Sequence, residues 1–182
     1  MSNLDLWDRV EKTDPKHTKK ANVRGNNITA IAPQRQIKNA TKEFGSYGQA
    51  WGFKDISLDF ALMERTGVII FKGVFFYPSG EFPIFSSISA FRDNAMLKPD
   101  ADFAKKVETD ALTKALSKIG FNADVFMGLY DDHKYVQMLN DEFNKPEPDN
   151  VALEWVAAIK EDSTVIEQLT DPKYKAYIQS LL

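Results

Sequence analysis

One amphipathic stretch, from Asp100 to Gly120, constrains the fold of this chain more than any other. Pro99 precedes it, and Asp100 is a residue type that caps helix N-termini. Apolar residues recur at helical spacing along the stretch, which predicts a helix of about five turns that ends at Gly120 and has one apolar face. The apolar residues of that face are Ala104, Val107, Ala111, Leu112, Ala115, Leu116 and Ile119.

The segment before this stretch has the patterns of β-strands. Apolar and polar residues alternate from 55 to 62, which predicts a half-buried strand with Ile56, Leu58, Phe60 and Leu62 inward. Two apolar runs, 68–76 and 82–91, flank a turn at residues 77–80 and predict a hairpin. The expected fold class is α+β: an antiparallel β-meander of three or more strands, with the long helix packed across one face.

Helices are also expected at both ends of the chain. Near the N-terminus, the pattern predicts a helix over residues 2–12 capped by Ser2, a loop from 13 to 27 with a turn at 24–27, and a strand over 28–31. Pro33 begins a second helix, which Gly45 ends. After it, Phe44 and Trp51 are expected in the core and Tyr47 at the surface.

The C-terminal part reads as a helix over 134–143 and then a small helical region. The Pro-rich segment 145–150 is typical of a linker. The expected organisation is a core domain over residues 1–144, this linker, and an acidic helical region over 151–182. Asp171 and Pro172 are placed to begin the last helix.

Charge is segregated along the chain, although the formal net charge is only −3. Between Pro15 and Lys42 there are seven basic residues and no acidic ones, a local charge of +7. Between Phe121 and Leu182 there are five Lys against twelve Asp plus Glu, a local charge of −7. This pattern favours a basic binding face and an acidic tail, although two solvated surfaces of unlike charge remain an alternative.

Catalytic and cofactor signatures do not stand out in the sequence. The two histidines have no metal-ligand spacing, and there is no phosphate-binding loop or nucleophile elbow. We therefore expect neither an enzyme nor a cofactor. Asp131 and Asp132 leave open a metal-dependent nuclease, but an adjacent acidic pair is more often a solvated turn.

Compartment follows from similar arguments. The chain has no cysteine, which suits a reducing cytoplasm. Its N-terminus does not look like a signal peptide, and its most apolar run is too short to span a bilayer. We expect a cytoplasmic protein with no membrane partner.

Three blocks resemble the single-strand annealing proteins of the Rad-fifty-two superfamily, especially their small phage relatives in recombination. The first runs from Ile31 to Trp51 and contains a short helix followed by FG-x-x-G-x-x-W. The second is the apolar hairpin from Val68 to Ile88. The third and most specific is AKKVETDALTKALSKIG followed by GLYDDHKYV. Together they span roughly residues 13–137, about two thirds of the chain.

The resemblance implies a β-meander with a long helix across it, assembly into homo-oligomeric rings, and single-stranded DNA in a basic groove. It implies ATP-independent annealing in recombination or repair, in a bacterial host cell if the gene belongs to a phage. Lys105 and Lys114 match DNA-contacting positions of the family, and Lys20 matches an arginine. Thr113, Ser117 and Ala30 depart from the family pattern.

The candidate DNA-binding residues come from the basic block and the long helix. They are Lys19, Lys20, Arg24, Arg35, Lys38, Lys42, Lys105, Lys106, Lys114 and Lys118. Helical geometry cannot place all four lysines of the long helix on one side, because Lys105 lies nearer the apolar arc. The acidic C-terminal region is expected to contact a partner protein or a neighbouring subunit. A single-strand-binding protein that does not anneal, or the nuclease above, are the alternatives.

Overall fold

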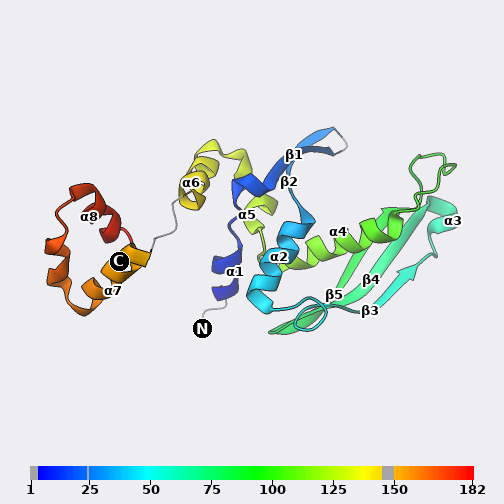
Figure 1. The fold of residues 1–182 in the computed structure, drawn as a ribbon. Helices are drawn as coiled ribbons and strands as arrows, with labels where there is room; N and C mark the ends of the chain where they lie inside the picture. Colours follow the sequence, from blue (N-terminus) through cyan, green and yellow to red (C-terminus); the bar gives the residue numbers. More distant parts are fainter. Residues whose placement is uncertain (1–3, 24, 145–149) are drawn as a thin grey trace. The chain divides into compact units, whose positions relative to one another are not determined.

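A computed structural model describes residues 4–23, 25–144 and 150–182 (Figure 1). The chain divides into two compact units, Met1–Phe143 and Asn144–Leu182. The predicted linker at 145–150 lies outside the described residues, except for Asn150, which is already the first residue of a helix.

The first unit mixes helices and strands. Its N-terminal half contains α1 (Asp5–Val10), the 3-10 helix η1 (Pro15–His17), β1 (Thr18–Val23), β2 (Asn26–Ile31) and α2 (Pro33–Phe44). The sheet region contains β3 (Gly52–Asp59), α3 (Met63–Thr66), β4 (Val68–Tyr77) and β5 (Gly80–Ser89). The long helix α4 (Phe103–Lys118) follows, and then α5 (Ala123–Phe126), η2 (Leu129–Asp131) and α6 (His133–Phe143).

The predicted meander is confirmed. Strands β3, β4 and β5 form an antiparallel sheet in that order, and the β4–β5 hairpin pairs from Val68 with Ser89 to Tyr77 with Gly80. Helix α4 lies across one face of the sheet (Figure 1). Buried side chains of α4 and of the sheet share one core, formed by residues such as Phe71, Phe75, Ile84, Val107, Ala111, Ala115 and Leu116. The fold is therefore α+β, as the hydrophobic pattern indicates.

The predicted side-chain alternation in β3 is wrong at Ile56 and Phe60, whereas Leu58 packs against the core as predicted. The strand ends at Asp59, and Ile56 and Phe60 are 54% and 48% exposed. Pairing with β4 shifts register between Lys54 and Ser57, and Asp55 has a φ of 53°. A bulge of this kind reverses which side chains face inward beyond it, so the period-two pattern does not hold through the strand.

The loop predicted from 13 to 27 is also wrong. Strands β1 and β2 pair antiparallel from Thr18 with Ile31 to Val23 with Asn26. The turn predicted between them contains Gly25, with a φ of 86°, while Arg24 lies outside the described residues. Strand β1 carries few apolar side chains, so it is held by backbone hydrogen bonds and leaves little hydrophobic pattern in the sequence.

The helix termini agree with the sequence in part. Helix α2 begins at Pro33 and is followed by Gly45, as predicted. Helix α1 is shorter than the predicted 2–12, and the proposed cap Ser2 lies outside the described residues. Asp100 is not the N-cap of α4, which is Asp102, but its carboxylate accepts the Asp102 N–H at 3.2 Å.

The second unit is wholly helical in its described part. It contains α7 (Asn150–Glu161), the 3-10 helix η3 (Ser163–Gln168) and α8 (Pro172–Gln179), packed around Ala152, Ile159 and Ile178. The Asp171 carboxylate accepts the Lys173 N–H at 2.8 Å, so the predicted cap of the last helix is confirmed.

None of the helices in the described ranges is long and apolar enough to cross a membrane.

Gly120 follows α4 in the chain and packs closely against the N-terminal helix α1. Its φ is 102°, and a Cβ atom built on it would lie 2.8 Å from Cγ of Trp7 in α1. We expect Gly120→Ala to lower the free energy of unfolding by roughly 3 kcal/mol, because backbone strain and overpacking add together. Urea denaturation followed by tryptophan fluorescence measures this loss.

Gly48→Ala is the matched control for that substitution. Gly48 has a φ of 83°, but a Cβ there would meet no atom within 4 Å. It should lose only the strain component, roughly 1–2 kcal/mol. Equal losses in the two variants would contradict a packing role for Trp7 against Gly120.

Candidate nucleic-acid interface

Helix α2 presents a basic face to solvent. Gln36 and Ala40 are buried, and Ile37 and Phe44 pack against the core. Because Arg35, Lys38 and Lys42 are spaced by three and four residues, they lie together on the side away from that core. Lys38 and Lys42 are exposed and Arg35 is half-buried. The core packing of α2 therefore fixes the direction in which its cations point.

The C-terminal end of α2 is held in place by the loop that follows it. Gly45 has a φ of 98°, and its carbonyl accepts the indole N–H of Trp51 at 2.9 Å. Trp51 has no exposed surface, so it is a core anchor as predicted. Phe44 packs against it edge-on, with ring centroids 6.5 Å apart.

The cations of α2 are available for a ligand. In the described part of the chain, Arg35, Lys38 and Lys42 form no ion pair. A cation without a carboxylate partner can bind a phosphate without first breaking an existing interaction. The three cations of the α2 face are thus close together, at least partly exposed, and not paired with a carboxylate.

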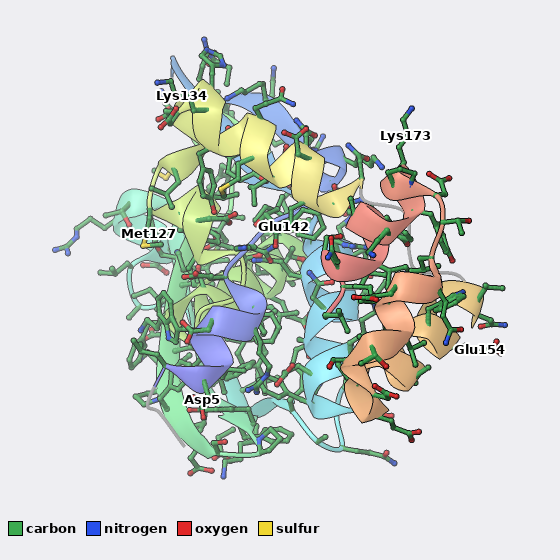
Figure 2. All side chains as sticks on the ribbon, turned by 90° about the vertical axis from the view of Figure 1, so that its left-hand side faces the viewer. Asp5, Met127, Lys134, Glu142, Glu154 and Lys173 are labelled. Carbon is green, nitrogen blue, oxygen red and sulfur yellow. The ribbon has the colours of Figure 1, made fainter. Side chains whose placement is uncertain are left out.

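Two of these cations also line a cleft between α1, α2 and α6. The cleft has a volume of about 430 Å³, and Arg35, Asn39 and Lys42 form its α2 side. Arg9 pairs with Glu43 of α2, and the Lys12 ammonium lies 2.8 Å from Glu142 of α6. Figure 2 shows Lys134 and Glu142 at opposite ends of α6. The other cations of the cleft thus pair with carboxylates, whereas Arg35 and Lys42 form no ion pair with any described residue there, and the lining also contains Asp8 and Asp14.

The β1–β2 hairpin carries further candidates. Lys19 and Lys20 are both exposed, and as neighbours in a strand they point to opposite faces of the hairpin. Lys20 donates a hydrogen bond to Thr29 Oγ1 at 2.8 Å across the strand pair. Arg24, the remaining candidate before α2, lies outside the described residues.

The four lysines of α4 have different surroundings. Lys105 lies 3.3 Å from Asp102, Lys106 2.5 Å from Asp100, and Lys114 2.6 Å from Asp110. The Lys118 ammonium lies 5.7 Å from the ring centroid of Phe82 in β5. To bind a phosphate, three of these lysines would have to give up an ion pair with a carboxylate. The fourth, Lys118, would have to give up its contact with an aromatic ring.

Lys106 is the most firmly held of them. The side chain of Asp100 is only 7% exposed, and it also lies 3.5 Å from Arg92. The hydrogen bond from Lys106 lowers the pKa of Asp100, against the opposing effect of burial. Losing Lys106 to a ligand would leave a nearly buried carboxylate with less compensation.

The structure does not bring all candidates to one face. Lys114 donates to Ser86 Oγ at 3.2 Å, so it leans over β5, as Lys118 does. Helix α2 instead packs against the part of α4 that carries Glu108, Thr109 and Leu112. The basic face of α2 and the lysines that lean over β5 are therefore separate surfaces.

A second pocket, which the sequence does not predict, lies between α2 and α4. Its volume is about 270 Å³, and its lining includes Gln34, Tyr47 and Glu108. Tyr47 is 44% exposed, which confirms the prediction of a surface aromatic. A pocket formed by residues 33–37, 47 and 108–112 depends on the packing of two helices, so hydrophobic periodicity cannot reveal it.

One residue of the acidic pair Asp131 and Asp132 has a structural role, namely Asp132. Asp132 accepts the Lys134 N–H at 2.8 Å, which caps the first turn of α6. Both residues are exposed. Within residues 4–23, 25–144 and 150–182, no group of three or more His, Cys, Asp or Glu side chains is arranged to hold a metal ion.

No protein-family model matches the chain, and a search of curated proteins finds no significant match. Its chemistry therefore has to be argued from the residues themselves.

Proposed function

We propose that this protein binds single-stranded DNA and anneals complementary strands without ATP, in recombination or break repair. The observation that carries the proposal is the α2 face, where Arg35, Lys38 and Lys42 share one side of a helix and have no carboxylate partner among the described residues. Cations in such a row contact successive phosphates. Lys19 and Lys20 are further exposed cations on the hairpin that precedes α2, one on each of its faces.

The charge distribution supports a ligand with an anionic backbone. The net charge of −3 would repel nucleic acid if it were spread evenly, but residues 15–42 carry +7. Electrostatic attraction acts over about one Debye length, ~10 Å at 0.1 M salt, so the local charge decides binding. Phosphate contacts carry no sequence information, so binding is expected to tolerate any sequence.

Annealing requires no bond chemistry. A protein that holds one strand by its phosphates leaves the bases free to test a complementary strand, and base pairing supplies the driving force. No cofactor is needed for such a step. We therefore propose that the chain is not an enzyme, and that its work is to hold and align strands.

Assembly into a ring is part of the proposal. Strands β3 and β5 form the two edges of the sheet, and Phe85 of β5 is 61% exposed on the face away from α4. Sheet edges and exposed aromatics are surfaces that a second copy could cover. We further propose that the C-terminal unit contacts a partner protein or a neighbouring subunit, and that the protein acts in the cytoplasm, which is that of a bacterial host cell if the gene belongs to a phage.

The direct test mixes two complementary oligonucleotides, one labelled with a donor and the other with an acceptor dye, without ATP or metal. We expect the protein to accelerate duplex formation at least tenfold over the spontaneous rate, because bound strands meet at a raised effective concentration. Energy transfer between the dyes measures the rate, and non-complementary strands are the control.

Each outcome of that test separates the hypotheses. Binding without acceleration indicates a single-strand-binding protein that does not anneal. Cleavage that appears only with Mg²⁺ indicates a nuclease. A monomeric mass at micromolar concentration, with and without DNA, would contradict the ring.

A further inference from the structure

The pocket between α2 and α4 has the composition of a site for a flat, polar ring. Pro33, Ile37 and Leu112 form apolar walls, Tyr47 contributes an aromatic surface, and Gln34, Glu108 and Thr109 are polar. Its volume of about 270 Å³ lies just below the usual range for drug-sized ligands, roughly 300–1,000 Å³. The space therefore suits a single heterocycle.

Tyr47 is a rigid platform within this pocket. Its ring packs edge-on against Trp51, with centroids 4.9 Å apart and an interplanar angle of 80°. The loop is closed by a hydrogen bond of 2.7 Å from Gly48 N–H to the Trp51 carbonyl. Because Trp51 is fully buried, Tyr47 is held before a ligand arrives and loses little conformational entropy on binding.

The polar side chains define a hydrogen-bonding pattern. Glu108 forms no ion pair with any described residue, so its carboxylate is a free acceptor. Thr109 already donates its hydroxyl to the Lys105 carbonyl at 2.8 Å, which leaves only its acceptor capacity. Gln34 can donate and accept. The pocket is therefore richer in acceptors than in donors.

The phenol of Tyr47 keeps its proton in this setting. Burial and the nearby Glu108 carboxylate both raise the pKa of Tyr47 above its usual value of 10.0. At neutral pH, Tyr47 therefore offers an uncharged ring. Tyr47 and Glu108 both line this pocket.

One cation stands next to the pocket. Lys38 is exposed and lies one helical turn from Gln34 on α2. A ligand with a neutral ring and an anionic backbone matches both the pocket and this rim. A basic peptide would match Glu108 but would be repelled by Lys38.

We propose that this pocket binds one unstacked nucleobase with an exocyclic amino group, which stacks on Tyr47 and donates to Glu108. The inference rests on the proposed binding of single-stranded DNA and adds a base preference to it. Carboxylates accept from the amino group of cytosine, whereas thymine presents a carbonyl oxygen at the same edge and is repelled. The protein should therefore favour cytosine over thymine, while phosphate contacts hold either strand.

The experiment compares binding of oligo(dC) and oligo(dT) of equal length by fluorescence anisotropy over a range of salt concentrations. We expect the protein to bind oligo(dC) about tenfold more tightly, the lower part of the range for one good base contact. Glu108→Gln should reduce the ratio to near one, because an amide can also donate to thymine. Tyr47→Ala should weaken both about tenfold without changing the salt slope.

Two further variants keep the result interpretable. Glu64→Gln removes an equal charge from an exposed position on α3 and should leave the base preference unchanged. Tyr47→Phe keeps the ring and should retain binding. If oligo(dC) and oligo(dT) bind equally, or if Glu108→Gln keeps the ratio, the pocket proposal is overturned while DNA binding stands. Absence of any binding to single strands overturns the proposed function and this inference with it.

Discussion

Replacing Arg35, Lys38 and Lys42 together by glutamine is expected to lower the affinity for single-stranded DNA roughly 100-fold at low salt, because three phosphate contacts are lost. The three side chains lie outside the apolar face of α2, so the helix and its packing on the core should persist. The plot of log affinity against log salt should become shallower by about 2, since each contact on a single strand contributes about 0.7. Anisotropy titrations at several salt concentrations measure both quantities.

A second triple variant gives the matched control. Lys105→Gln, Lys114→Gln and Lys118→Gln together remove the same charge from α4, where Lys105 and Lys114 pair with aspartates and Lys118 lies over Phe82. We expect a loss of less than tenfold, because these cations are already partly neutralised. A loss as large as that of the α2 variant would place DNA along α4, where the family resemblance puts Lys105 and Lys114.

Lys106 is left out of that control for a physical reason. Its removal would leave Asp100, which is nearly buried, with only Arg92 and a backbone N–H as partners. A weaker affinity in such a variant could then reflect a damaged N-terminus of α4 instead of a lost phosphate contact. A change in the DNA affinity of such a variant would not distinguish between these two causes.

The sequence predicts those parts of the fold in which a hydrophobic pattern and a turn signal agree. The β4–β5 hairpin, α2 and α4 all follow from such agreement, and Gly45 ends α2 where predicted. The sequence also predicts a strand at 28–31, which β2 (Asn26–Ile31) confirms, but β1 has no apolar face and its residues are predicted as loop. In β3, one bulge at Asp55 is enough to put Ile56 on the surface.

The candidate site was predictable as a set of residue types but not as a surface. The acid-free run from 15 to 42 directs attention to α2, and its helical spacing gives the direction of Arg35, Lys38 and Lys42. The ion pair between Lys106 and Asp100 depends on the path of the chain just before α4, because Asp100 lies six residues before Lys106. The pocket with Tyr47 and Glu108 joins residues far apart in sequence, and only tertiary packing reveals it.

One buried polar cluster ties the N-terminal segment to the region after α4. The Asp124 carboxylate is 1% exposed and accepts the Thr13 N–H at 2.8 Å and the Thr13 hydroxyl at 2.6 Å. It also accepts the Tyr135 hydroxyl at 3.2 Å, while the Tyr130 hydroxyl donates to the Thr13 carbonyl. Burial first, and Asp124 second, raise the pKa of both phenols, so both stay protonated donors at neutral pH.

Asp124→Ala is expected to lower the free energy of unfolding of the first unit by about 4 kcal/mol. The substitution leaves the N–H and hydroxyl of Thr13 without their acceptor in a buried site, and each unsatisfied buried group costs about 1–3 kcal/mol. The N-terminal segment should then open before the rest. The measurement is hydrogen exchange at the Asn122 amide, which donates to the Val10 carbonyl at 2.9 Å in the folded protein.

The control for that variant is Asp141→Ala on α6. Asp141 accepts Gln137 Nε2 at 2.9 Å, but it is exposed, so its loss should cost less than about 0.5 kcal/mol. Asp124→Asn keeps one acceptor oxygen and should fall between the two. If Asp124→Ala left the exchange of Asn122 as slow as Asp141→Ala does, water would be able to satisfy the Thr13 donors. The cluster would then not be what holds α1 against the end of α4.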